Sequence, residues 1–218
     1  MSNAVIEFFQ QHTIKGFLAE DEGQALYQIA MAAAPIGPCL EVGSYCGKST
    51  VYLGMACKAM NNTLYAVDHH RGSEEHQIGE EYHDADLKNH TNSGIDSFPL
   101  FRKTLQLAEL EETVVPLVCS SAVAAKDWAT PLGLVFIDGG HSPEMSRQDC
   151  LSWSEKIAVG GCLAIHDIFE KPSDGGQGPY WAMEAVLAEG DFVLRGRVNS
   201  LAMIQRIKCR FTQYPRRL

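Results

Sequence analysis

The stretch from Leu40 to Thr50, LEVGSYCGKST, decides how this sequence is interpreted. A short apolar run leads into Gly43, and Gly47 opens a segment with helical spacing. A strand, a glycine turn and a helix in that order form the usual ligand-binding corner of an α/β protein. Two interpretations compete, because GKST matches the end of a phosphate-binding loop whereas EVG matches the start of a turn that binds a nucleoside cofactor.

The spacing of the two glycines argues against the phosphate loop. Such a loop needs four residues between its glycines, so that successive backbone N–H groups surround a phosphate. Gly43 and Gly47 have three residues between them. Asp68 ends the next apolar run, 21 residues after Gly47, where a carboxylate can bind both ribose hydroxyls. The pattern favours an adenosyl cofactor over a nucleoside triphosphate, and Lys48 is then expected to face solvent.

Strand-like runs alternate with helical segments on both sides of this corner. Strands are expected at 37–43, 63–68, 113–119, 132–138 and 160–167, and helices at 48–60, 98–110, 121–129, 143–157 and 179–190. Helical patterns at 4–20 and 22–34 precede them, and strands at 191–198 and 201–207 follow. This alternation predicts an α/β fold with a doubly wound, mostly parallel seven-stranded sheet and an antiparallel C-terminal edge hairpin.

Composition narrows the classes of partner. The chain has 218 residues, a net charge of −9 and 45% hydrophobic residues. An acidic chain is a poor match for nucleic acid or an anionic membrane, and no apolar run reaches the roughly 20 residues of a membrane span. The seven cysteines are scattered without a C-x-x-C pair, as expected for reduced thiols. We therefore expect a cytoplasmic protein that acts on a small molecule.

One long polar segment, residues 69–97, interrupts the alternation directly after the second expected strand. A connection of this length inside a compact domain is usually a functional lid. We predict N-terminal helices at 1–34, one main domain at 35–208 that carries this lid, and a basic tail at 209–218. The N-terminal helices are also the expected contact of a homodimer.

The motifs resemble those of a known enzyme family. LEVGSYCGKST is similar to the first motif of class I S-adenosylmethionine-dependent methyltransferases, E/D-x-G-x-x-x-G, and in particular to that of the catechol O-methyltransferase branch. VDHH at 67–70 resembles the second motif. LVFIDGGH at 134–141, with HD at 166–167, resembles a family of uncharacterised small methyltransferases. The resemblance implies a Rossmann-like methyltransferase fold, S-adenosylmethionine as cofactor, and O-methylation of a small molecule.

The resemblance also implies which residues bind the cofactor. The glycine corner should line the methionine end, Asp68 should hold the ribose, and His69 should lie beside the adenine. Ser121 and Ala122 match the loop that flanks the adenine ring. The complete set of expected cofactor contacts is Glu41, Gly43, Ser44, Tyr45, Gly47, Ser49, Asp68, His69, Ser121, Ala122 and Asp138.

The expected catalytic residues are two acids and two histidines at the ends of adjacent strands. Asp138 and Asp167 would face one cleft, where carboxylates repel unless a proton or cation lies between them. In the catechol-type enzymes the matching acids bind Mg²⁺, and His141 stands where those enzymes have a catalytic lysine, which suits a general base. Strand alternation predicts that His166 points away from Asp167. Ile168 replaces the expected asparagine, so a divalent metal on Asp138, Asp167 and His141 is left open, and a histidine ligand would favour a transition metal.

Two other classes of protein remain alternatives at this point. One is a protein that binds S-adenosylmethionine without transferring its methyl group, and the other is a metal-dependent hydrolase on a similar sheet. The acid–histidine cluster argues against the first, and Asp68 with the glycine turn argues against the second. The sequence does not identify the substrate or its accepting atom.

Overall fold

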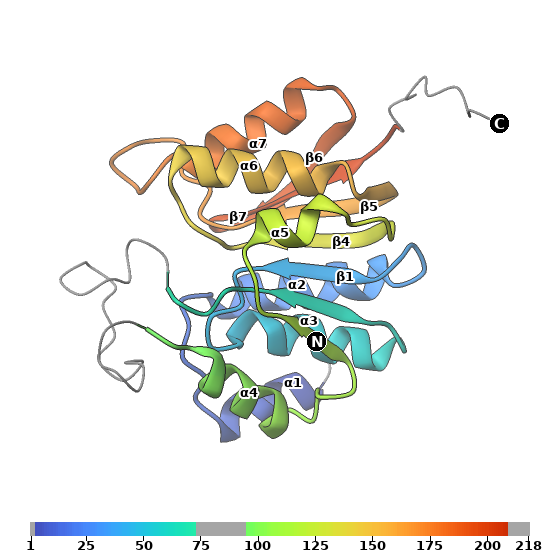
Figure 1. The fold of residues 1–218 in the computed structure, drawn as a ribbon, viewed down its shortest axis with the longest axis vertical. Coiled ribbons are helices and arrows are strands. Elements are labelled where there is room, and N and C mark those ends of the chain that lie inside the picture. Colours follow the sequence, from blue (N-terminus) through green and yellow to red (C-terminus); the bar gives the residue numbers. More distant parts are fainter. Residues whose placement is uncertain (1–2, 73–94, 209–218) are drawn as a thin grey trace.

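Seven strands form one sheet in the computed structural model, which describes residues 3–72 and 95–208. The strand order is β3-β2-β1-β4-β5-β7-β6 (Figure 1). The strands are β1 (Cys39–Val42), β2 (Leu64–Val67), β3 (Val114–Leu117), β4 (Leu132–Ile137), β5 (Ile157–Ile165), β6 (Phe192–Val198) and β7 (Leu201–Arg206). Strands β1 to β5 pair in parallel, and β7 is antiparallel to both β5 and β6. The predicted sheet with its antiparallel edge hairpin is confirmed.

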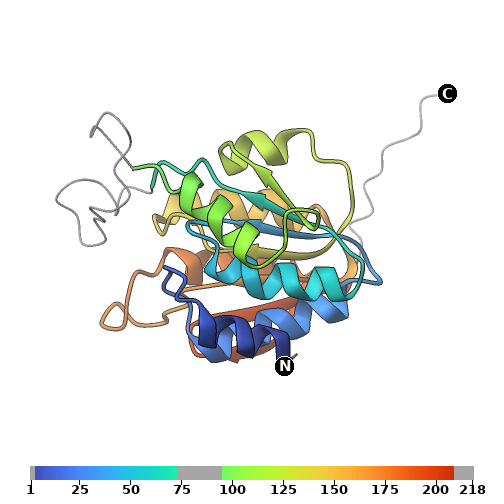
Figure 2. The same cartoon turned by 90° about the horizontal axis from the view of Figure 1, so that it is seen from below.

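Helices cover both faces of the sheet (Figures 1 and 2). The helices are α1 (Asn3–Gln11), α2 (Glu20–Ala33), α3 (Lys48–Ala59), α4 (Phe98–Leu107), α5 (Ser121–Lys126), α6 (Pro143–Ser154) and α7 (Gly178–Ala188). Side chains alternate along a strand, so β4 supplies two cores. Leu134 and Phe136 pack in the core with α1 to α4, and Val135 and Ile137 pack in the core with α6 and α7.

The first predicted helix is too long. The expected helix over 4–20 ends at Gln11, and residues 12–19 form an irregular connection to α2, which we call the strap. Gly16 has φ +154°, and a Cβ there would lie 2.8 Å from the Cβ of Lys48. Phe17, which lies within the expected helix, is 66% exposed. The strap therefore packs against α3 as irregular chain.

Only the two ends of the predicted lid lie within the described residues. The Ser97 backbone N–H donates to the His70 carbonyl at 3.1 Å, and the Ser97 hydroxyl is 2.8 Å from Nδ1 of the buried His70 ring. The two ends thus meet beside the sheet. Residues 73–94 and the predicted basic tail at 209–218 lie outside the described residues.

Two further expectations concern the whole chain. No helix among the described residues is long and apolar enough to cross a membrane. The six cysteines at described positions all have free thiols, four of them buried. The predicted homodimer, the domain limits and the cytoplasmic location stay predictions.

Candidate active site

The glycine corner is formed by the close approach of two strand ends. Gly43 has φ +86°, and a Cβ at this position would lie 2.0 Å from the carbonyl oxygen of Asp138. Only glycine fits both that backbone conformation and that contact. Gly47 has φ +92° and precedes the first turn of α3. The corner therefore brings the residues that follow β1 directly against those that follow β4.

Asp68, directly after β2, fixes the shape of the loop. Its Oδ2 accepts hydrogen bonds from the backbone N–H groups of Ser44 at 3.0 Å and Tyr45 at 2.8 Å. Its Oδ1 accepts from the backbone N–H of His70 at 2.7 Å. Tyr45 has φ 46°, a left-handed conformation that these bonds hold in place. Because a carboxylate has about four acceptor positions, Asp68 can bind this loop and a ribose together.

Glu41 and Gly47 lie behind the loop. Glu41 is fully buried, and its two carboxylate oxygens accept hydrogen bonds from the hydroxyls of Ser49 at 2.5 Å and Thr50 at 2.6 Å. Burial raises the pKa of Glu41 to about 8, although both hydroxyl bonds lower it. Glu41 thus ties β1 to the first turn of α3. Glu41 and Gly47 were both expected to contact the cofactor. Neither residue lines the cavity in front of the loop.

A cavity of about 350 Å³ opens at the carboxyl ends of β1, β2, β4 and β5. It gathers most of the site residues expected from the sequence. These are Gly43, Ser44, Tyr45, Ser49, Asp68, His69, Ser121, Ala122, Asp138, His141, His166 and Asp167. The Ser44 hydroxyl oxygen is buried there without a hydrogen-bond partner among the described residues. The cavity therefore offers an unsatisfied polar atom to a ligand.

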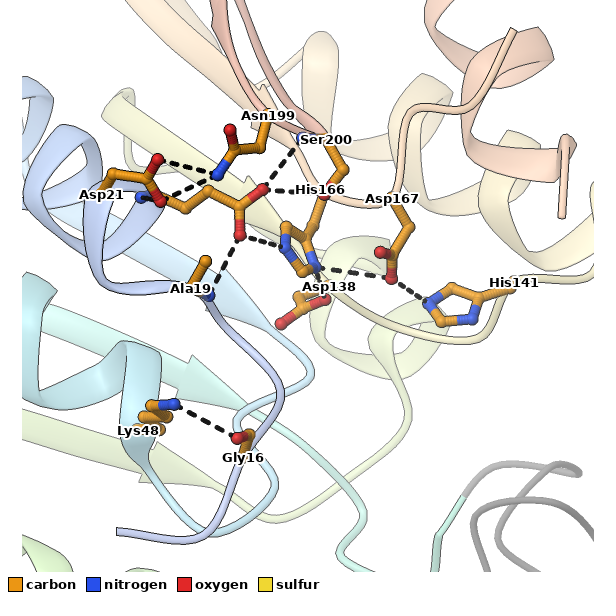
Figure 3. A network of polar contacts seen from close by, with 11 residues as sticks. Gly16, Ala19, Asp21, Lys48, Asp138, His141, His166, Asp167, Asn199 and Ser200 are labelled. Carbon is orange, nitrogen blue, oxygen red and sulfur yellow. Dashed lines mark hydrogen bonds and ion pairs between the residues drawn. The ribbon is translucent and has the colours of Figure 1, made fainter. Parts of the chain in front are cut away.

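The two acids and two histidines meet at one end of this cavity (Figure 3). His141 Nε2 lies 3.0 Å from Asp167 Oδ2, and His166 Nδ1 lies 3.0 Å from Asp138 Oδ1. His166 Nδ1 is also 3.4 Å from Asp167 Oδ2. The prediction that His166 and Asp167 point apart is therefore wrong. Asp167 has φ 54°, which ends the strand geometry and turns both side chains toward the cleft.

A third carboxylate, Glu22 of α2, completes the cluster. Its Oε2 lies 3.0 Å from His166 Nε2, and both side chains are almost fully buried. Each ring nitrogen of His166 thus faces a carboxylate, which only the doubly protonated ring can satisfy. Burial alone would lower the pKa of His166, but Asp138, Asp167 and Glu22 together raise it to about 12. The ring is an imidazolium held between acids.

Glu22 also joins two distant parts of the chain. Burial alone would raise the pKa of Glu22, but hydrogen bonds from His166 and Ser200 outweigh it and lower that pKa to about 2. Glu22 Oε1 accepts from the backbone N–H of Ser200 at 3.0 Å and from its hydroxyl at 2.8 Å. Next to it, Asn199 donates to both Asp21 oxygens at 2.8 Å. The start of α2 is thereby bound to the turn between β6 and β7 (Figure 3).

The strap lines the cavity and is fastened at two points. The Lys48 ammonium donates to the Gly16 carbonyl at 3.3 Å, and the Ala19 backbone N–H donates to Glu22 Oε2 at 3.1 Å. Lys48 is half-buried and lines the cavity, so the expectation that it faces solvent is wrong. Lys15, Gly16, Phe17 and Leu18 line the cavity as well. These four residues were not predicted to line a site because their segment has a helical pattern.

The residues expected to bind a metal are close enough to share one. Single ligand atoms of Asp138, His141 and Asp167 lie within 4.8 Å of one another. Two carboxylate oxygens and an imidazole nitrogen suit a divalent transition metal. Ile168 is buried in the apolar core and adds no ligand. The donor set therefore fits a divalent cation with three protein ligands.

This fold and site define a methyltransferase. Residues 40–168, more than half of the chain, match a family described as a methyltransferase domain, and the chain belongs to that family.

Similar solved structures share the fold. The O-methyltransferase TomG from Streptomyces achromogenes, in complex with S-adenosylmethionine, has 13% sequence identity over 95% of this chain and 91% of its own, with a TM-score of 0.63. An O-methyltransferase from Bacillus cereus, in complex with S-adenosylhomocysteine, has 13% identity over 95% and 92%, with a TM-score of 0.61. The O-methyltransferase NovP has 17% identity over 85% and 80%, with a TM-score of 0.64.

Proposed function

We propose that this methyltransferase transfers the methyl group of S-adenosylmethionine to an oxygen atom of a small molecule. The observation that carries the proposal is one cavity that joins the glycine corner and Asp68 to the acid–histidine cluster. TomG and the Bacillus cereus enzyme, which share the fold, were solved with S-adenosylmethionine and S-adenosylhomocysteine. The proposed acceptor is an alcohol or phenol, because the cluster supplies a base for a hydroxyl proton.

The cavity suits this cofactor in charge and in hydrogen bonding. S-adenosylmethionine supplies an electrophilic methyl group on a positively charged sulfur. Three carboxylates surround the single imidazolium of His166, so the cluster attracts a cation. The unpartnered Ser44 hydroxyl can bind the amino-acid end of the cofactor, and the acceptor position that remains on Asp68 can bind a ribose hydroxyl.

His141 is the proposed general base. If its Nε2–H donates to Asp167 at 3.0 Å, its Nδ1 is left unprotonated and can take the proton of the acceptor hydroxyl. Burial alone would raise the pKa of Asp167, but hydrogen bonds from His141 and His166 outweigh it and hold that pKa well below its usual range. Asp167 therefore stays ionised and orients His141. His166 in turn restrains Asp138 and Asp167.

The same residues could use a metal. A divalent cation held by Asp138, His141 and Asp167 would lower the pKa of an acceptor hydroxyl. In that case His141 would bind the cation and would not act as the base.

Calorimetry with S-adenosylmethionine and with ATP tests the cofactor. We expect S-adenosylmethionine to bind and ATP not to bind, and the reverse result would contradict the proposal. Release of S-adenosylhomocysteine with a panel of phenols, catechols and alcohols then tests the transfer.

The variant His141→Ala tests the base. We expect its transfer rate to fall roughly 100- to 10,000-fold, the usual contribution of a general base, while its affinity for S-adenosylmethionine stays unchanged. Measuring the metal content of both proteins separates the two roles of His141. Full activity of the variant with no bound metal would exclude His141 as the base.

A further inference from the structure

A buried carboxylate on helix α6 lines the cavity and takes no part in the function proposed above. Asp149 is only 8% exposed, yet it lines the cavity. A Cβ on Gly139, in the loop after β4, would lie 3.2 Å from its Oδ2. Asp149 therefore stands on the α6 side of the cavity, against the loop that carries the catalytic residues.

The hydrogen bonding of Asp149 is incomplete. Among the described residues, only the Ser121 hydroxyl is placed to donate to it, and that oxygen already accepts the Trp153 indole N–H at 2.8 Å. Burial raises the pKa of Asp149, and the Ser121 hydroxyl lowers it only in part. A buried carboxylate normally has several donors. A ligand N–H is the partner that this one lacks.

The cavity that Asp149 lines offers apolar surface to a flat ring. Val67, Cys119, Ala122 and Met145 add apolar surface to the same cavity, and Gly139 has no side chain to fill the space. Apolar walls with a small number of polar groups are typical of a site for a heterocyclic base. Among these groups Asp149 is a negatively charged acceptor, so it selects a base that presents an N–H donor.

The order of the strands indicates which part of the cofactor reaches Asp149. Asp68, the proposed ribose contact, follows β2, and the acid–histidine cluster follows β4 and β5. Strand β3 lies on the other side of β2 and leads into α5, which packs against α6. With the sulfur end at the cluster and the ribose at Asp68, the base extends toward the space between α5 and α6, where Asp149 lies.

We propose that Asp149 accepts a hydrogen bond from the exocyclic amino group of adenine and makes the site specific for adenosyl over inosyl ligands. This inference rests on the proposed use of S-adenosylmethionine. Hypoxanthine carries a carbonyl oxygen where adenine carries the amino group. That oxygen would face the carboxylate with no proton between them, a mismatch that costs far more than a lost contact at the surface.

Calorimetry with S-adenosylhomocysteine and S-inosylhomocysteine tests this assignment. We expect the wild-type protein to bind the adenosyl ligand about 10- to 100-fold more tightly, the usual range for a hydrogen bond to a charged group. The variant Asp149→Asn should reduce this ratio to about threefold or less, because an amide can donate to the hypoxanthine oxygen as well as accept from adenine. Asp149→Ser, which removes the buried charge, should reduce it too if the Asn variant does not fold.

The control is Glu144→Gln on the same helix. Glu144 is exposed and does not line the cavity, so its loss removes one negative charge from α6 without changing the ratio. Equal affinity of the wild-type protein for both ligands, or an unchanged ratio in the folded Asp149 variants, would overturn the assignment. Failure of the wild-type protein to bind S-adenosylhomocysteine at all would instead contradict the proposed function.

Discussion

Glu22 and His166 are 144 residues apart in the sequence, yet they form a buried ion pair at 3.0 Å. The variant Glu22→Ala would leave the His166 ring and the Ser200 donors without their acceptor. Because it removes one partner of a buried charged pair, we expect it to lower the free energy of unfolding by about 3–5 kcal/mol, measured by urea denaturation.

The neighbouring acid provides the control for that variant. Asp21 is exposed and accepts hydrogen bonds from Asn199 of the same turn and from the Glu22 backbone N–H, and not from His166. Asp21→Ala should cost about 1 kcal/mol, as for an ordinary hydrogen bond. Equal losses in the two variants would show that the contact with the turn, and not the pair with His166, carries the stability.

The buried carboxyl group of Glu41 leads to a prediction about how the stability of the protein depends on pH. Its pKa rises from an ordinary 4.5 to about 8 in the folded protein. An acid whose pKa is raised by folding adds stability that is fully present below pH 4.5 and is lost as the pH rises through 8. Glu41→Gln cannot titrate, so the stability of the variant relative to the wild-type protein should increase between pH 4.5 and 8. A constant difference across that range, measured by denaturation, would refute this role.

At the scale of single residues, the sequence predicted the site residues that lie next to a motif. Asp138, His141, His166 and Asp167 were found because they follow apolar runs, and such runs end at the same edge of a parallel sheet. Glu22 was missed because acids are common in the first turn of any helix. Nothing local distinguishes an acid that binds a distant histidine from one that only faces the helix dipole.

Among the elements, the strap carries the largest difference from the sequence prediction. Residues 4–20 showed one helical pattern, but the helix ends at Gln11, and the strap that follows packs against α3 through Gly16. The later strands and helices were predictable because each contains several apolar residues at a clear period. An irregular segment of eight residues, whose contacts include hydrogen bonds with Lys48 and Glu22 of other elements, has no such pattern.

The strap also leads to a prediction at this scale. Lys48→Met keeps the length and apolar stem of the side chain but removes its bond to the Gly16 carbonyl. If the strap retains a bound cofactor, S-adenosylhomocysteine should dissociate about fivefold faster, in line with the loss of one hydrogen bond. Stopped-flow fluorescence measures this rate.

Lys58→Met is the matched control for Lys48→Met. Lys58 lies in the last turn of the same helix and donates to the Glu109 carbonyl at 2.9 Å, outside the cavity. The Lys58→Met variant should leave the dissociation rate of S-adenosylhomocysteine unchanged. If both variants release the ligand at the wild-type rate, the strap does not hold the cofactor.

At the scale of the whole molecule, the sheet order depends on pairings that no local pattern encodes. The sequence indicated seven strands and a C-terminal hairpin. It did not indicate that β7 lies between β5 and β6 in the sheet. That arrangement brings the Asn199–Ser200 turn beside the start of α2, 178 residues away in the chain. The site therefore combines residues from the beginning, middle and end of the chain.

The bond between Glu22 and Ser200 has a consequence for how the protein is made. Glu22 leaves the ribosome well before the turn that carries Ser200, which lies 178 residues further along the chain. Until that turn arrives, a buried acid and its histidine partner lack two of their hydrogen bonds. Chains released before residue 200 would carry every residue that lines the cavity and still lack a finished active site. The acid–histidine cluster is therefore complete only after the hairpin of β6 and β7 has been synthesised and has docked against α2.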